Sequence, residues 1–165
     1  MSIGFTYREA LHGRFHWLDA PLVEREAKLS LAVAAESIPR SFQSRRLSIS
    51  GSLSLEDFVH ETPVSGTVGI KIRERRIPYD FSFEHEGRVF RALGEKDLHP
   101  SLMGDALGRL PLSLFDDRNY EVARAVLFVP IASGSLSTLV SFRLRWFERK
   151  QNEATLGPNR EGGPS

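Results

Sequence analysis

The stretch that decides the fold runs from Arg46 to Asp97 and reads RLSISGSLSLEDFVHETPVSGTVGIKIRERRIPYDFSFEHEGRVFRALGEKD. Apolar side chains fall on every second position: Leu47, Ile49, Gly51, Leu53 and Leu55, then Val68, Ile70 and Ile72, then Ile77, Tyr79, Phe81 and Phe83. A period of two is the pattern of a β-strand with one buried face. Three or four such strands with short breaks predict an antiparallel meander on a hydrophobic core.

The same alternation extends the sheet in both directions along the chain. Near the N-terminus it predicts one long strand, bent near Gly13, with one parity formed by Phe5, Tyr7, Leu11, Gly13, Phe15 and Trp17. A second strand around residues 28–35 directs Leu29, Leu31 and Val33 inward. Toward the C-terminus, Val122–Val129 is nearly all apolar and is predicted to be covered on both sides. Alternation over Val140–Trp146 predicts a last strand.

The breaks between these strands have the composition of turns. Glu56–Pro63 interrupts the alternation and is predicted to be either a connecting loop or a short helix. Arg73–Arg76 reads as a charged hairpin tip. Glu84–Gly87 is a further hairpin, because Gly87 suits a left-handed turn position.

One segment has helical spacing instead. After Pro100, apolar residues lie three or four positions apart, at Leu102, Met103, Ala106, Leu107 and Leu110. Proline at the start of a helix lacks only a donor that has no partner there. We therefore expect a helix over Pro100–Pro111 that packs against the sheet, followed by a turn-rich link over Leu114–Tyr120.

The predicted fold class is mainly β, with about eight or nine strands and one packed helix. Closure removes exposed strand edges, so an antiparallel barrel or a two-sheet sandwich, lipocalin-like in outline, is expected. Residues 1–147 form a single domain in this interpretation. Residues 148–165 are polar and rich in turn formers, which predicts a flexible tail.

Composition excludes several functional classes. The 165 residues include 22 basic and 21 acidic side chains, so a net charge of +1 offers no field to attract nucleic acid or an anionic membrane. The absence of cysteine excludes a disulfide framework and a thiolate metal site. No apolar run approaches the roughly 20 residues of a membrane span, and the first residues lack a secretory signal pattern. We expect a cytoplasmic protein without metal or cofactor.

Polar side chains that could form a site gather at one strand end. Glu95, Lys96, Asp97 and His99 combine acidic, basic and imidazole groups in five residues. General acid and base chemistry could be assembled from such a set. The competing interpretation is a solvated strand end, with Asp97 near the start of the predicted helix.

Aromatic residues dominate the predicted inner parity: Phe15, Trp17, Tyr79, Phe81, Phe83, Phe90, Phe128, Phe142 and Trp146. Small barrels either fill themselves with such side chains or surround an apolar ligand. If a ligand is enclosed, its expected lining is Phe81, Phe83, Phe90, Leu107 and Trp146.

A family resemblance rests on several short segments in order. They are Tyr7–Gly13, Ser65–Val68, Tyr79–Phe83, Gly87–Lys96 and the apolar segment that follows. Together they resemble the β-rich domain fused to some bacterial flavin-dependent oxidoreductases of the glucose-methanol-choline type, including relatives of cholesterol oxidase. The resemblance implies an accessory domain, because the glycine-rich flavin loop is absent, and it carries over no catalytic residue. It suits an apolar ligand such as a sterol or fatty chain, or a docking surface for a partner enzyme.

Three functions therefore stay open at the level of the sequence. The first is a non-catalytic barrel that binds an apolar, lipid-like or sterol-like molecule and is accessory to an oxidoreductase. The second is a protein-protein interaction module with a filled core. The third is a small enzyme that uses the corner from Glu95 to His99.

Overall fold

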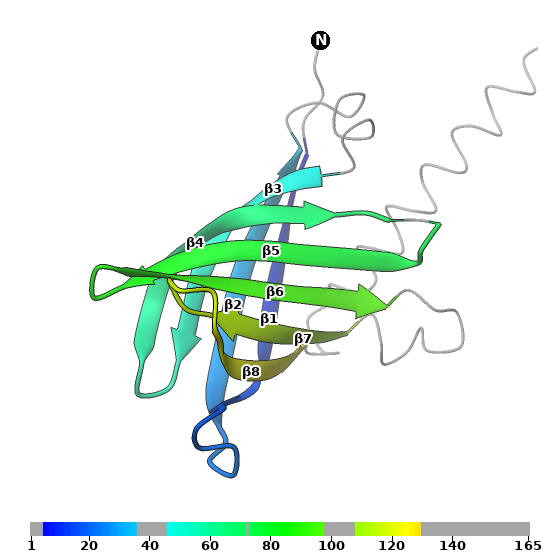
Figure 1. The fold of residues 1–165 in the computed structure, drawn as a ribbon. Helices are drawn as coiled ribbons and strands as arrows, with labels where there is room; N and C mark the ends of the chain where they lie inside the picture. Colours follow the sequence, from blue (N-terminus) through cyan, green and yellow to red (C-terminus); the bar gives the residue numbers. More distant parts are fainter. Residues whose placement is uncertain (1–4, 36–45, 72, 98–107, 130–165) are drawn as a thin grey trace, which may run out of the picture. The chain divides into compact units, whose positions relative to one another are not determined.

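The protein is a closed antiparallel β-barrel of eight strands (Figure 1). The computed structural model describes residues 5–35, 46–71, 73–97 and 108–129. In chain order the strands are β1 (Phe5–Trp17), β2 (Arg25–Ala35), β3 (Arg46–Leu55), β4 (Val59–Gly69), β5 (Arg76–His85), β6 (Arg88–Asp97), β7 (Arg109–Phe115) and β8 (Glu121–Phe128). The expected strand over Val140–Trp146 and the expected tail over residues 148–165 lie outside the described residues.

Every strand pairs with its sequence neighbour, and β1 also pairs with β8. The pairs from His12 with Phe128 to Trp17 with Ala123 close the sheet on itself. Closure satisfies the backbone donors and acceptors that the two edge strands would otherwise expose. The barrel, rather than the two-sheet sandwich, is therefore the architecture of this chain.

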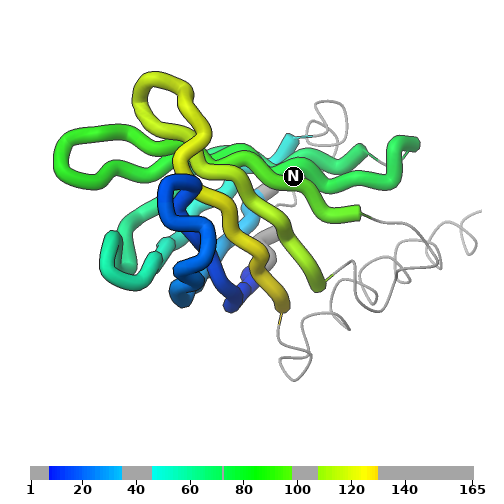
Figure 2. The backbone as a smooth tube through the Cα atoms, turned by 60° about the horizontal axis from the view of Figure 1, so that its bottom comes forward, coloured from blue at the N-terminus to red at the C-terminus, as the bar shows by residue number. Residues whose placement is uncertain are grey.

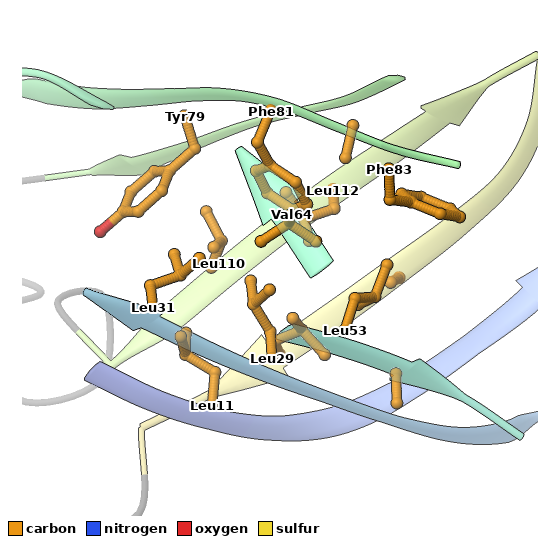
Figure 3. Close-up of a cluster of buried hydrophobic side chains, with 14 of the residues drawn as sticks. Leu11, Leu29, Leu31, Leu53, Val64, Tyr79, Phe81, Phe83, Leu110 and Leu112 are labelled. Atoms are coloured by element: carbon orange, nitrogen blue, oxygen red, sulfur yellow. The ribbon is translucent and has the colours of Figure 1, made fainter. Parts of the chain in front are cut away.

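The core of the barrel takes buried side chains from all eight strands, because alternate residues of each strand point inward. In Figure 3, side chains from opposite walls meet in the middle of the barrel. The largest fully buried ones are Phe15, Phe81, Leu11, Leu29, Leu55, Leu110, Leu114 and Leu127. The inward positions predicted for Leu29, Leu31 and Val33 are confirmed.

Two glycines mark places where neighbouring strands approach very closely. A Cβ at Gly13 would lie 1.9 Å from the carbonyl oxygen of Val126, and a Cβ at Gly51 would lie 1.8 Å from that of Ser30. No side chain fits at either distance, so glycine permits the strong strand curvature that a small closed barrel requires. The predicted special role of Gly13 in the first strand is thus explained by contact with β8.

The two ends of the barrel differ (Figure 2). The end that we call the short-turn end carries the connections β1–β2, β3–β4, β5–β6 and β7–β8. At the β5–β6 hairpin, Glu86 and Gly87 both have positive φ, 51° and 74°, as a two-residue hairpin of this type requires. This hairpin confirms the prediction for Glu84–Gly87. We call the opposite end, where β2 leads into residue 36 and β6 into residue 98, the far end.

No helix occurs among the described residues, and the predicted helix over Pro100–Pro111 is wrong at its C-terminal end. Residues from Arg109 onward belong to β7, in which Leu110, Leu112 and Leu114 alternate inward. The helical prediction counted Leu110 at a spacing of three from Leu107 and overlooked this period of two. The rest of the predicted helix, residues 100–107, lies outside the described residues.

Two strand predictions also need correction. The connection predicted over Glu56–Pro63 is shorter, because β4 begins at Val59 and an irregularity near Glu61, with φ 45°, disturbs the alternation. The strand over Val122–Val129 is not covered on both sides, since its residues alternate between buried and exposed. Phe128, predicted to point inward, is 49% exposed.

Replacing Gly51 with alanine tests the close approach of β2 and β3. The new methyl group would meet the Ser30 carbonyl, so we expect Gly51→Ala to lower the free energy of unfolding by about 3 kcal/mol or more. Ser50→Ala, on the exposed face of the same strand, should change it by less than about 0.5 kcal/mol. Urea denaturation measures both, and equal effects would contradict the close packing of these strands.

Candidate functional site

An ion pair between Glu9 and Lys96 is buried inside the barrel. The two residues are 3% and 2% exposed, and among the described residues they are the charged ones that are buried. Glu9 lies on the inward face of β1, and Lys96 lies on the inward face of β6. The pair is joined by Tyr79 of β5, whose side chain extends into the barrel (Figure 3).

Both oxygens of the Glu9 carboxylate accept hydrogen bonds. Lys96 Nζ donates to Oε1, and the Tyr79 hydroxyl donates to Oε2 over 3.1 Å. The Lys96 ammonium also lies 5.4 Å from the centre of the Tyr79 ring, a cation–π distance. We call these three residues the lumen cluster.

The lumen cluster spans the barrel from wall to wall. In the closed order of eight strands, β5 lies four places from β1 in either direction, so the bond from Tyr79 to Glu9 crosses the interior. The register places apolar residues beside every member: Leu31 opposite Glu9, Ile77 opposite Lys96, and Val68 opposite Tyr79. The three polar groups are therefore embedded in apolar surroundings, where charges interact strongly.

Two of the four polar residues predicted to form a site, Glu95 and Lys96, lie on opposite faces of the sheet. Consecutive residues of a strand face opposite sides, so Lys96 points into the barrel while Glu95 binds Arg76 on the outside, with 2.8 Å between Nη1 and Oε1. Asp97 is exposed at the end of β6. His99 lies outside the described residues.

Among the aromatic residues predicted to line a ligand, Phe83 and Phe90 pack against each other. Phe83 and Phe90 stack with ring centres 5.4 Å apart, and the edge of Phe58 meets Phe90 at 5.4 Å and Trp17 at 4.8 Å. Phe81 is fully buried in the middle of the barrel. These rings fill the short-turn end of the lumen. Leu107 and Trp146, predicted to complete the lining, lie outside the described residues.

Sequence reasoning missed Glu9, although a signal was present. Glu9 has the same parity as Leu11 and Phe15, and Lys96 has the same parity as Phe90 and Ala92. Charged side chains rarely occupy inward positions unless they are paired. Two opposite charges on inward positions of different strands indicate a buried ion pair.

An open depression of about 380 Å³ lies beside the β3–β4 turn. Its lining mixes acidic and basic groups, including Glu26, Lys28, Asp57 and His60, and is not an apolar enclosure. In the described part of the chain, no group of three or more histidine, aspartate or glutamate side chains is arranged to hold a metal ion. The lumen cluster is consequently the better candidate site.

Ion pairs on the outer face join β5 to β6, join β6 to the β7–β8 turn, and connect two residues of β8. Arg91 holds Asp80 through two hydrogen bonds and so lowers the pKa of that carboxyl, and Arg88 lowers the pKa of Asp117 in the same way. Hydrogen bonds from Arg124, and secondarily from Ser113, lower the pKa of Glu121 to about 2.

Comparison with protein-family models, curated proteins and solved structures finds no match to this chain. The resemblance to an accessory domain of flavin oxidoreductases stays a prediction. Among the residues that the structure describes, no helix is long and apolar enough to cross a bilayer.

A double-mutant cycle measures how much the ion pair between Glu9 and Lys96 contributes to the free energy of unfolding. Lys96→Met or Glu9→Gln leaves a charge buried without its partner, so each should lower the free energy of unfolding by about 3–5 kcal/mol. The double variant should be at least as stable as either single variant. The exposed pair of Arg76 and Glu95, mutated to Met and Gln, is the matched control and should contribute about 0–1 kcal/mol. Additive losses at Glu9 and Lys96 in urea titrations would contradict a direct pair.

The lowered pKa of Glu121, the first residue of β8, predicts that the free energy of unfolding depends on pH. Its folded pKa is below its unfolded value of 4.5, so its stabilisation is complete above pH 4.5 and disappears as the pH falls toward 2. The free energy of unfolding of Glu121→Gln should therefore lie below that of the wild type at pH 6 and approach it near pH 2. Urea titrations across this range measure the difference, and a constant gap would contradict the assignment.

Proposed function

We propose that this protein is a non-catalytic barrel that binds an apolar small molecule carrying a polar head group, with the lumen cluster as the anchor for that head. Binding sites for small molecules are mostly apolar and have a few convergent polar groups. The lumen cluster, surrounded by Leu31, Val68 and Ile77, has this composition. The resemblance to an accessory domain favours a sterol-like or fatty ligand and a role beside an oxidoreductase.

The observation that carries the proposal is the burial of two charges in an otherwise apolar lumen. Replacing a buried ion pair with well-packed apolar residues is often neutral or stabilising. Apart from the hydroxyl of Tyr79, the other buried side chains of the described strands are apolar. Binding of a polar head group by Glu9 and Lys96 explains why two charged residues interrupt this apolar pattern.

The differences between the two ends of the barrel favour a ligand at the far end. Phe58, Phe83 and Phe90 occupy the short-turn end. The lumen cluster lies toward the other end, since Lys96 is the second-last residue of β6 and Tyr79 is near the start of β5. Apolar side chains of the neighbouring strands could contact the body of the ligand there: Val33, Leu47, Ile49 and Val68.

A second candidate function is protein interaction, and one observation favours it. Leu22 is 96% exposed in the β1–β2 turn, and Tyr120 is 67% exposed in the β7–β8 turn. These turns are joined at their bases, where the Leu18 N–H donates to the Val122 carbonyl oxygen over 2.9 Å. Exposed apolar side chains at one end of a barrel are a feature of contact surfaces.

Catalysis by the corner from Glu95 to His99 has less support, because Glu95 and Lys96 face opposite sides of the sheet. A cytoplasmic location stays a prediction from the N-terminal sequence.

Native mass spectrometry of the purified protein, followed by organic extraction, tests ligand binding. Two matched variants locate the ligand: Leu47→Phe and Leu55→Phe both enlarge a buried leucine of β3, near the far end and near the short-turn end respectively. We expect an apolar mass bound to the wild type and to Leu55→Phe, and at least a several-fold lower occupancy in Leu47→Phe.

Two outcomes would contradict the proposal. An empty wild-type protein that also takes up no added fatty alcohol or sterol would exclude ligand binding, and a dimer lost on Leu22→Ser would then favour the interaction module. Retention of the ligand by Leu47→Phe with loss in Leu55→Phe would place the site at the wrong end.

A further inference from the structure

We infer that the head group taken by the lumen cluster is an uncharged oxygen acceptor, a hydroxyl or a carbonyl, and not a carboxylate. The inference rests on the proposed function and specifies its ligand class. It follows from the hydrogen-bonding capacity and the net charge of Glu9, Lys96 and Tyr79.

The donor for this head group is the Lys96 ammonium. A lysine ammonium has three N–H groups. Within the described part of the chain, the oxygen that accepts from Lys96 belongs to Glu9, and the ring of Tyr79 lies beside the same nitrogen. As far as the described residues show, an N–H is left for a further acceptor, in surroundings where an unused donor is unfavourable. An oxygen of the ligand head would complete the coordination of the ammonium.

Each carboxylate oxygen of the lumen cluster already accepts a hydrogen bond. One Glu9 oxygen binds Lys96 and the other binds the Tyr79 hydroxyl. Both carboxylate oxygens have a partner, whereas the ammonium has three N–H groups and one oxygen acceptor among the described residues. The cluster therefore lacks an acceptor more than a donor, and both alcohols and carbonyl compounds provide one. An alkylammonium ligand would instead bring a second positive charge next to Lys96.

The net charge of the lumen cluster disfavours a ligand with a carboxylate head group. The charges of Glu9 and Lys96 cancel, so a neutral ligand leaves the lumen neutral. A ligand carboxylate on Lys96 would place a second negative charge close to Glu9, and burial makes such like-charge repulsion strong. Fatty acids are thus expected to bind less tightly than the matching alcohols.

Binding of dodecanol, dodecanoate and dodecane at pH 7 tests this inference, because the three probes share one chain and differ in the head. For the wild type we expect dodecanol to bind about tenfold more tightly than either of the others, measured by displacement of a fluorescent apolar probe. Glu9→Gln leaves the Lys96 charge uncompensated, so this variant should bind dodecanoate more tightly than dodecanol. Lys96→Met should bind dodecanol and dodecane equally.

Glu95→Gln is the matched control, since it removes the same charge one residue from Lys96 but on the outside of the barrel. This variant should bind the three probes with the same order of affinity as the wild type. If a single variant does not fold, the double variant Glu9→Gln with Lys96→Met replaces it, and it should lose the preference for dodecanol over dodecane.

The outcomes separate the inference from the proposed function. If the wild type binds none of the three probes, the proposed function fails and the inference fails with it. If the wild type prefers dodecanoate, or if Glu9→Gln or the double variant keeps the wild-type order as Glu95→Gln does, the inference is overturned while ligand binding stands.

Discussion

The pairing of β1 with β8 is the constraint on which the rest of the structure depends. It turns an eight-strand meander into a closed barrel and so defines an inside, which is filled by alternate residues of each strand. Close approach at Gly13 and Gly51 permits the curvature. Closure also brings β1 opposite β5, and it is this arrangement that allows Glu9 to meet Tyr79 and Lys96 across the lumen.

The filling of the barrel changes with position along its axis. At the short-turn end, rings of Phe58, Phe83 and Phe90 contact one another and fill the lumen. Toward the far end, a buried pair of charges replaces apolar packing. Burying charges is unfavourable unless they are well paired, and this change of chemistry within one lumen is the reason that we propose a ligand site there.

Much of the fold could be predicted because a half-buried strand imposes a period of two on its sequence. Strands β3 and β5 and most of β6 follow from that pattern, and the hairpin between β5 and β6 follows from the glycine at position 87. Prediction failed near Leu110, which lies at a helical spacing from Leu107 and at a strand spacing from Leu112. It failed again where an irregular residue, Glu61, broke the alternation. It also failed at Phe128, because parity cannot be carried reliably from one strand to the next across a turn of unknown geometry.

The sequence by itself determined the β class, the inward face of most strands and the need to bury an aromatic core, since these depend on spacings of a few residues. Only the tertiary structure decided that the sheet closes, and that Glu9 and Lys96, separated by 87 positions, form one buried pair. It also decided that Glu95 and Lys96, adjacent in the chain, belong to opposite faces with different partners. The physical reason is that a strand separates neighbours while a closed barrel joins distant residues across its interior.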